Sequence, residues 1–119
     1  MKVFIHLKSL DNPRDFFTPI ILNGVINADA DNFSSSEVIQ VVNKLITDSN
    51  KSILFLEVSD NHDAGSLLGI LKAAFKYREK IKVYYKGENE NVLMMATKLD
   101  ATKISQDKLY SVSQNYFKE

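Results

Sequence analysis

The sequence predicts an α/β fold in which a mixed sheet of four to five strands is flanked by helices. Three observations support this prediction. Segments with the two-residue period of strands alternate along the chain with segments of helical period. Residues 52–58 are nearly all apolar, as in a strand that is covered on both faces. A length of 119 residues is typical of one domain, so we expect residues 1–119 to form a single domain.

Residues 2–7 predict the first strand, with alternate side chains on opposite faces. Val3, Ile5 and Leu7 share one face, and Phe4 and His6 share the other. Asp11-Asn12-Pro13 supplies residues that favour a turn.

Residues 19–26 predict a second strand, in which Gly24 marks a bulge or a close approach of another backbone. We expect it to pair with the first strand as a hairpin. Residues 27–32 are polar and predict a loop. This loop begins like a calcium-binding loop, but Asn32 and Val38 stand where the glycine and the glutamate of such a loop are required. We therefore predict no metal site.

Residues 34–48 predict the first helix, with Ser34 as N-cap and Glu37 at the third helical position. Its apolar residues recur every three or four positions and end near Asp48. The apolar segment 52–58 that follows is the predicted central strand.

The second half of the chain predicts a helix over 64–79 with Asp63 as its N-cap, then a strand over 81–86 that ends at Gly87. A third helix over 89–99 and a short last strand over 109–112 complete the pattern. The predicted order is β-β-α-β-α-β-α-β, with parallel pairing of the later strands.

The composition excludes several classes of function. Fifteen basic residues balance fifteen acidic ones, and the lysines are spread along the chain, so we expect no nucleic-acid partner. The absence of cysteine excludes disulfides, thiolate metal sites and cysteine nucleophiles. No apolar run approaches the ~18 residues of a spanning helix, so we expect no membrane insertion and a cytoplasmic location.

The segment from about residue 20 to residue 100 resembles the STAS domain, which is named for sulfate transporters and anti-sigma factor antagonists. The second strand with Gly24, the strand 53–58 that leads to Asp63, and the helix that begins Leu67-Leu68-Gly69 carry the resemblance. It implies a bacterial, cytoplasmic interaction module whose partner is a kinase-like anti-sigma factor.

In this family the second hydroxyl residue of an Asp-Ser-Ser-Gly-Leu-Gly turn is phosphorylated. Aligned on Asp63 and Leu67, this chain has Ala64 and Gly65 at the two hydroxyl positions and Ser66 at the glycine position. Ser66 is therefore the candidate phosphosite, and we expect the phospho-switch to be lost or displaced.

The leading hypothesis is a regulatory module without enzymatic activity or cofactor. It would bind its protein partner through the exposed face of helix 64–79 and through the turn residues Asp63, Ala64, Gly65, Ser66 and Leu67. The alternative is a small enzyme or ligand-binding protein that uses Asp60, His62 and Asp63, at the carboxyl end of the predicted central strand. A structural subunit of a larger assembly is a third hypothesis.

Overall fold

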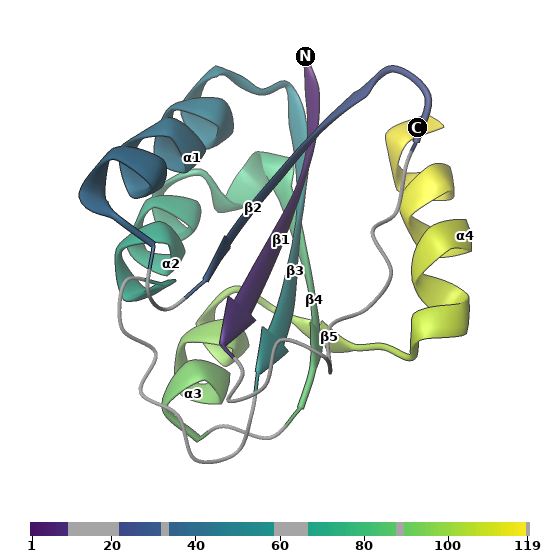
Figure 1. Ribbon diagram of the computed structural model, residues 1–119. Helices are drawn as coiled ribbons and strands as arrows, with labels where there is room; N and C mark the ends of the chain where they lie inside the picture. Colours follow the sequence, from purple (N-terminus) through teal and green to yellow (C-terminus); the bar gives the residue numbers. More distant parts are fainter. Residues whose placement is uncertain (10–21, 32–33, 59–66, 88–89, 119) are drawn as a thin grey trace.

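A computed structural model of the chain describes residues 1–9, 22–31, 34–58, 67–87 and 90–118. Its five strands form one parallel sheet in the order β2-β1-β3-β4-β5 (Figure 1). The strands are β1 (Lys2–Ser9), β2 (Val25–Asp31), β3 (Lys51–Val58), β4 (Ile81–Lys86) and β5 (Thr102–Lys103). The α/β prediction is confirmed, but the sheet is parallel and not mixed.

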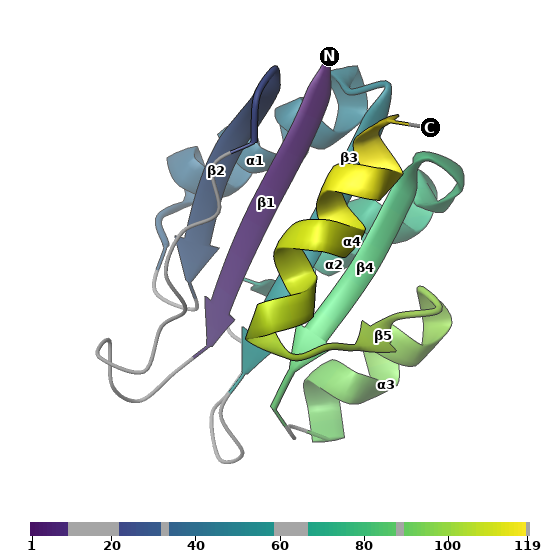
Figure 2. The ribbon, with the colours of Figure 1, turned by 90° about the vertical axis from the view of Figure 1, so that its right-hand side faces the viewer.

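Helices cover both faces of the sheet. On one face lie α1 (Ser36–Asp48), α2 (Leu67–Lys76) and α3 (Glu90–Lys98), and on the other lies α4 (Gln106–Lys118) (Figures 1 and 2). A short 3₁₀ helix, Arg78–Lys80, leads from α2 into β4. Among the described residues, three α-helices thus form the layer on one face of the sheet, and α4 lies on the other.

Strand β1 has the predicted alternation. Val3, Ile5 and Leu7 are fully buried in the core between the sheet and the three-helix layer. Phe4 lies in a second core cluster together with Leu109 and Phe117 of α4. A strand with apolar side chains on both faces needs a covering layer on each side, and this requirement explains the position of α4.

Strand β3 confirms the predicted central strand. It lies in the middle of the five strands, and Ile53, Leu54, Phe55 and Leu56 are each at most 1% exposed. Strand β4 matches its predicted bounds and pairs with β3 in parallel as expected. The two-residue strand β5, which was not predicted, pairs with β4 in parallel.

The predicted hairpin is wrong. Strand β2 comprises residues 25–31, most of which were assigned to a loop, and it pairs with β1 in parallel, Lys2 opposite Val25 and Leu7 opposite Ala30. The alternation of small apolar and polar residues explains the difference: Ala28 and Ala30 pack on the core, while Asp29 and Asn27 are on the opposite face. Asn27 and Asp29 are both exposed on that face of the edge strand.

The first helix begins one residue later than predicted. Ser35 is the N-cap, and its hydroxyl accepts a hydrogen bond from the Val38 amide at 3.4 Å. Ser34 instead binds the end of β2, where its hydroxyl accepts a hydrogen bond from the Asp31 amide at 2.9 Å. The helix ends at Asp48, as predicted.

The predicted strand over 109–112 is also wrong, because this segment lies in α4. Leu109, Ser113 and Phe117 recur every four residues and are buried against the sheet. Two hydrogen bonds fix the last turn of the helix: Lys51 Nζ donates to the Tyr116 carbonyl at 3.0 Å, and Tyr116 Oη donates to the Lys80 carbonyl at 3.2 Å.

The first turn of α4 carries Asp107. A hydrogen bond with the Ser105 side chain is the largest cause that lowers the pKa of Asp107, followed by a backbone hydrogen bond. The carboxylate therefore stays ionised near the amino terminus of the helix, where negative charge is favourable.

Truncation of Phe117 tests whether α4 closes the second face of the sheet. Phe117→Ala should lower the free energy of unfolding by about 3–5 kcal/mol, because it removes a large buried ring. Tyr110→Ala, at a half-exposed position on the same helix, should cost less than about 1 kcal/mol. Urea unfolding followed by circular dichroism measures both values, and equal costs would contradict this packing.

Candidate functional site

The structure describes only part of the predicted docking turn. Its residues Asp63, Ala64, Gly65 and Ser66 lie outside the described residues, as do Asp60 and His62 of the alternative ligand site. Leu67 is the first residue of α2, and its side chain is fully buried in the core. The part of the predicted surface that the structure describes is therefore the outer face of α2.

The outer face of α2 carries apolar side chains. Ile70, Leu71 and Ala74 face the core, whereas Leu68 and Phe75 are 36% and 40% exposed, with Lys72 between them. The spacing 68, 72, 75 places these three residues in one row along the helix. Two large apolar side chains are thus partly exposed on one face of α2, on either side of Lys72.

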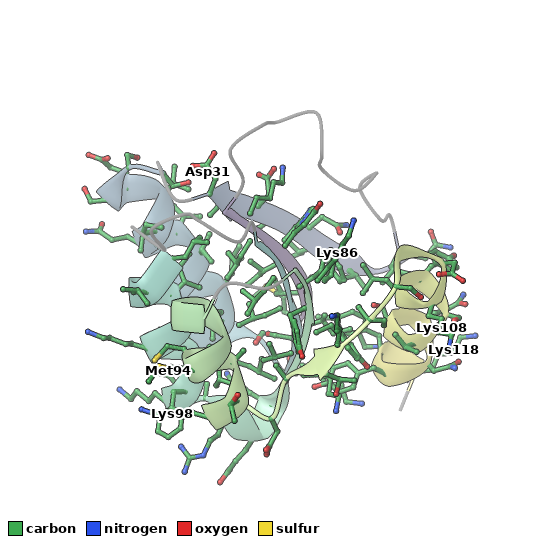
Figure 3. The ribbon with its side chains drawn as sticks, turned by 90° about the horizontal axis from the view of Figure 1, so that it is seen from below. Asp31, Lys86, Met94, Lys98, Lys108 and Lys118 are labelled. Carbon is green, nitrogen blue, oxygen red and sulfur yellow. The ribbon has the colours of Figure 1, made fainter. Side chains whose placement is uncertain are left out.

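A hollow lies between α2 and α3. It has a volume of about 320 Å³ and is lined by Phe75 and Met95 together with Lys72 and Lys98. Met94, the residue before Met95 in α3, is 67% exposed, and Figure 3 labels it. We call the outer side chains of this region the α2–α3 surface: Leu68, Lys72, Phe75, Met94, Met95 and Lys98.

The α2–α3 surface is basic as well as apolar. Lys72 and Lys98 take no part in the two ion pairs found among the described residues. The Arg78 guanidinium lies 4.5 Å from the centre of the Phe75 ring, and its Nη1 donates to the Phe75 carbonyl at 3.0 Å. These contacts hold the exposed ring in place beside a third positive charge.

A second candidate site is a buried pair on the α4 side of the sheet. His6 Nε2 lies 2.8 Å from Glu57 Oε1, and the two residues are 8% and 2% exposed. The His6 ring is also 5.1 Å from the ring of Phe55, centre to centre. The alternation of the first strand placed His6 on the same face as Phe4, but Glu57 was not predicted as its partner. In the sequence, Glu57 is distinctive because it is the one carboxylate within the apolar segment 52–58.

The pair lies near the carboxyl ends of the two central strands. From β1 the strand order runs to β2 on one side and to β3 on the other. Open α/β sheets bind ligands outside the carboxyl ends of the strands at such a reversal. Lys8 Nζ, two residues after His6, lies 3.1 Å from Asp29 Oδ2 of β2, so polar side chains extend across this end of the sheet.

The chemistry available at His6 is limited to hydrogen bonding and proton transfer. A carboxylate that binds one ring nitrogen fixes the orientation of the imidazole, as in sites of general acid–base catalysis. Among the described residues, no group of three or more His, Asp or Glu side chains could hold a metal ion. Within the same ranges, no helix has the length and apolar character needed to cross a membrane.

Double-mutant analysis measures the coupling of the buried pair. His6→Phe and Glu57→Met should each destabilise the fold, because each leaves a buried polar partner unsatisfied. Together they should cost about 1–3 kcal/mol less than the sum of the single effects. Urea unfolding of the four proteins at pH 7 gives this value, and additive effects would show that the two side chains do not interact.

No family model, curated protein or solved structure matches this chain. The resemblance to the STAS domain therefore depends on the residues that carry it, namely the strand with Gly24, the strand that leads to Asp63 and the start of α2. The comparisons assign the chain to no family, so its function is argued from the geometry of the α2–α3 surface and of the His6–Glu57 pair.

Proposed function

We propose that this protein is a non-enzymatic interaction module, similar to the anti-sigma factor antagonists, which binds a regulatory protein partner through the α2–α3 surface and the adjoining turn 63–66. The observation that carries the proposal is the hollow floored by Phe75 and Met95 and bordered by Lys72 and Lys98. The partner that fits it presents an apolar side chain flanked by carboxylates.

The composition of the surface supports a protein partner. Interfaces concentrate their binding energy in a few aromatic and other large side chains at the centre, and a polar rim surrounds them. Phe75 meets the description of such a central residue, because it is exposed, aromatic and held by Arg78. The lysines of the rim would accelerate encounter with an acidic partner more than they would raise the final affinity.

The turn 63–66 joins this surface through the chain itself, since Leu67 follows Ser66 directly and begins α2. A phosphate on Ser66 would add roughly −1.5 to −2 charges one residue before the helix. A charge placed there would oppose the carboxylates of an acidic partner. A kinase-like anti-sigma factor remains the proposed partner class, with Ser66 as its candidate phosphosite.

Site-specific crosslinking would identify the partner. A photoreactive amino acid placed at Leu68 should crosslink, in the native cell, to one regulatory protein, and the same amino acid at Tyr110 on the opposite layer should not. The purified partner should then bind the unmodified chain at least tenfold more tightly than it binds the Phe75→Ser variant. This difference corresponds to about 1.4 kcal/mol or more of binding free energy. Circular dichroism checks that each variant is folded.

Charge reversal separates the role of the lysines at the border of the hollow from that of Phe75 at its centre. Lys72→Glu combined with Lys98→Glu should slow association with that partner and weaken its salt dependence. Lys108 is an exposed lysine of α4, so Lys108→Glu is the matched control. It should change neither the association rate nor its salt dependence. Unchanged binding in Phe75→Ser, in the double lysine variant and in Ser66→Asp would refute the proposal.

The His6–Glu57 pair favours a second candidate function, the binding of a ligand at the carboxyl ends of β1 and β3 with Asp60, His62 or Asp63 of the following loop. The favourable observation is a hydrogen-bonded histidine and carboxylate where the strand order reverses. In that case a ligand found by metabolite screening should lose binding in His62→Ala and in His6→Phe. Retained binding in both variants would exclude this site.

A further inference from the structure

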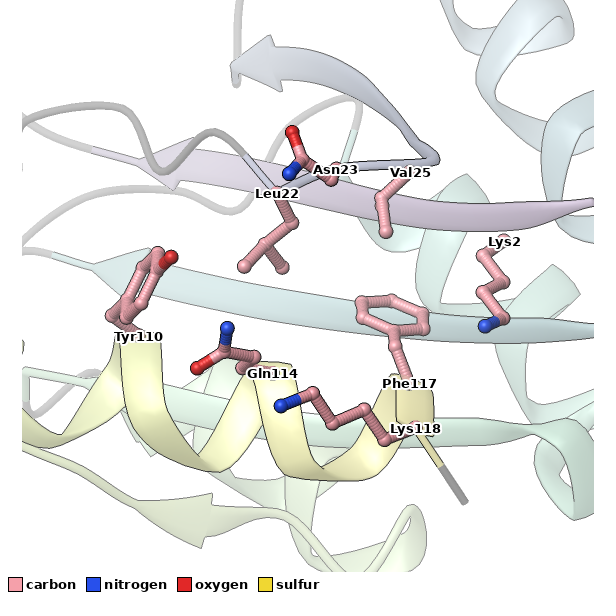
Figure 4. A pocket seen from close by; sticks show the side chains of 8 residues that line it. All are labelled: Lys2, Leu22, Asn23, Val25, Tyr110, Gln114, Phe117 and Lys118. Carbon is pink, nitrogen blue, oxygen red and sulfur yellow. The ribbon is translucent and has the colours of Figure 1, made fainter.

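A groove lies on the other side of the sheet, between α4 and the amino-terminal parts of β1 and β2. It has a volume of about 270 Å³, close to the lower end of the range of about 300–1,000 Å³ typical of small-molecule sites. Figure 4 shows side chains from three separate segments of the chain around it. They are Lys2, Leu22, Asn23, Val25, Tyr110, Gln114, Phe117 and Lys118.

The floor of the groove is apolar and rigidly held. Leu22 and Phe117 are 6% and 5% exposed and belong to the core cluster that joins α4 to the sheet. Val25 packs against the same cluster. The exposed edges of these packed side chains form the apolar part of the groove lining.

The charges that border the groove are of one sign. Lys2 comes from β1 and Lys118 from the last turn of α4, and both side chains are exposed. In Figure 4 the Lys118 side chain runs back along the helix toward Gln114, so its ammonium lies away from the helix end. None of the eight lining residues is acidic. In a chain of zero formal charge, this is a local concentration of positive charge.

Uncharged polar groups complete the lining. Asn23 precedes β2 and Gln114 faces the groove from α4, and each carries an amide that can both donate and accept hydrogen bonds. The half-exposed Tyr110 lies at one end with its ring and hydroxyl. Few directional polar groups above an apolar floor are typical of sites that orient one small ligand.

From these observations we propose that the groove binds a small organic anion that consists of one apolar ring and one carboxylate or phosphate. The ring lies on Leu22 and Phe117, and the anionic group is attracted by Lys2 and Lys118, whose ammonium groups lie on opposite sides of the Phe117 ring (Figure 4). Asn23 or Gln114 binds a remaining polar group. This site is separate from the α2–α3 surface, which lies on the opposite layer, so the two proposals can fail independently.

Nuclear magnetic resonance titration of the ¹⁵N-labelled 119-residue chain tests the site. The probes are phenyl phosphate and phenylacetate as anions, benzyl alcohol as the neutral analogue, benzylamine as the cation and inorganic phosphate as the bare anion. At least one ring-bearing anion should shift the side-chain amide signals of Asn23 and Gln114 with a Kd of about 1 mM. Comparison of phenyl phosphate with phenylacetate shows which anionic group is preferred.

Lysine variants link the binding to the groove. Lys2→Gln and Lys118→Gln should each weaken the better probe about threefold, and the double variant about tenfold, because each removes one partner of the anion. Lys108→Gln, on α4 but not among the lining residues, is the matched control and should leave the Kd unchanged. Thermal unfolding checks that the variants keep their stability.

Four results would overturn the proposal. They are no saturable shift with either ring-bearing anion, equal binding of benzyl alcohol or benzylamine, equal binding of inorganic phosphate, and an unchanged Kd in the double lysine variant. The third result would mean that the lysines attract any anion and that the apolar floor contributes nothing.

Discussion

The pairing of β1 with β3 at the centre of the sheet is the constraint on which the other features depend. Each of these strands has a parallel neighbour on both sides, so their backbone groups are satisfied within the sheet. Their side chains are buried on both faces, and each face therefore needs its own covering layer. The three-helix layer covers Val3, Ile5 and Leu7, and α4 covers Phe4.

The burial of both strand faces also explains why His6 and Glu57 are paired. Both residues follow the alternation of their strands and face the α4 side, where an isolated charge would be costly. Each side chain supplies the hydrogen-bond partner that the other needs. Whatever its functional role, the pair links the two central strands near the end of the sheet where ligands of α/β proteins bind.

The two layers leave surfaces of different character. The three-helix layer exposes an apolar hollow bordered by lysines, of a shape that suits a projecting side chain of another protein. On the opposite face, a groove lies between α4 and residues 22–25. The proposed docking surface and the proposed anion site thus lie on opposite layers, and their separation would allow both to be occupied at once.

The sequence alone determined the α/β class, the two faces of β1, the central position of β3, the bounds of β4 and the end of α1, because each follows from a local period or a local cap. Tertiary structure decided the direction of β2 and the helical state of residues 109–112. The alternating alanine and aspartate residues of β2 form a strand because they pair with β1. Residues 109–112 are helical because α4 packs Leu109 and Phe117 against the face of the sheet. The His6–Glu57 pair and the groove each join residues far apart in the sequence, so no local pattern contained them.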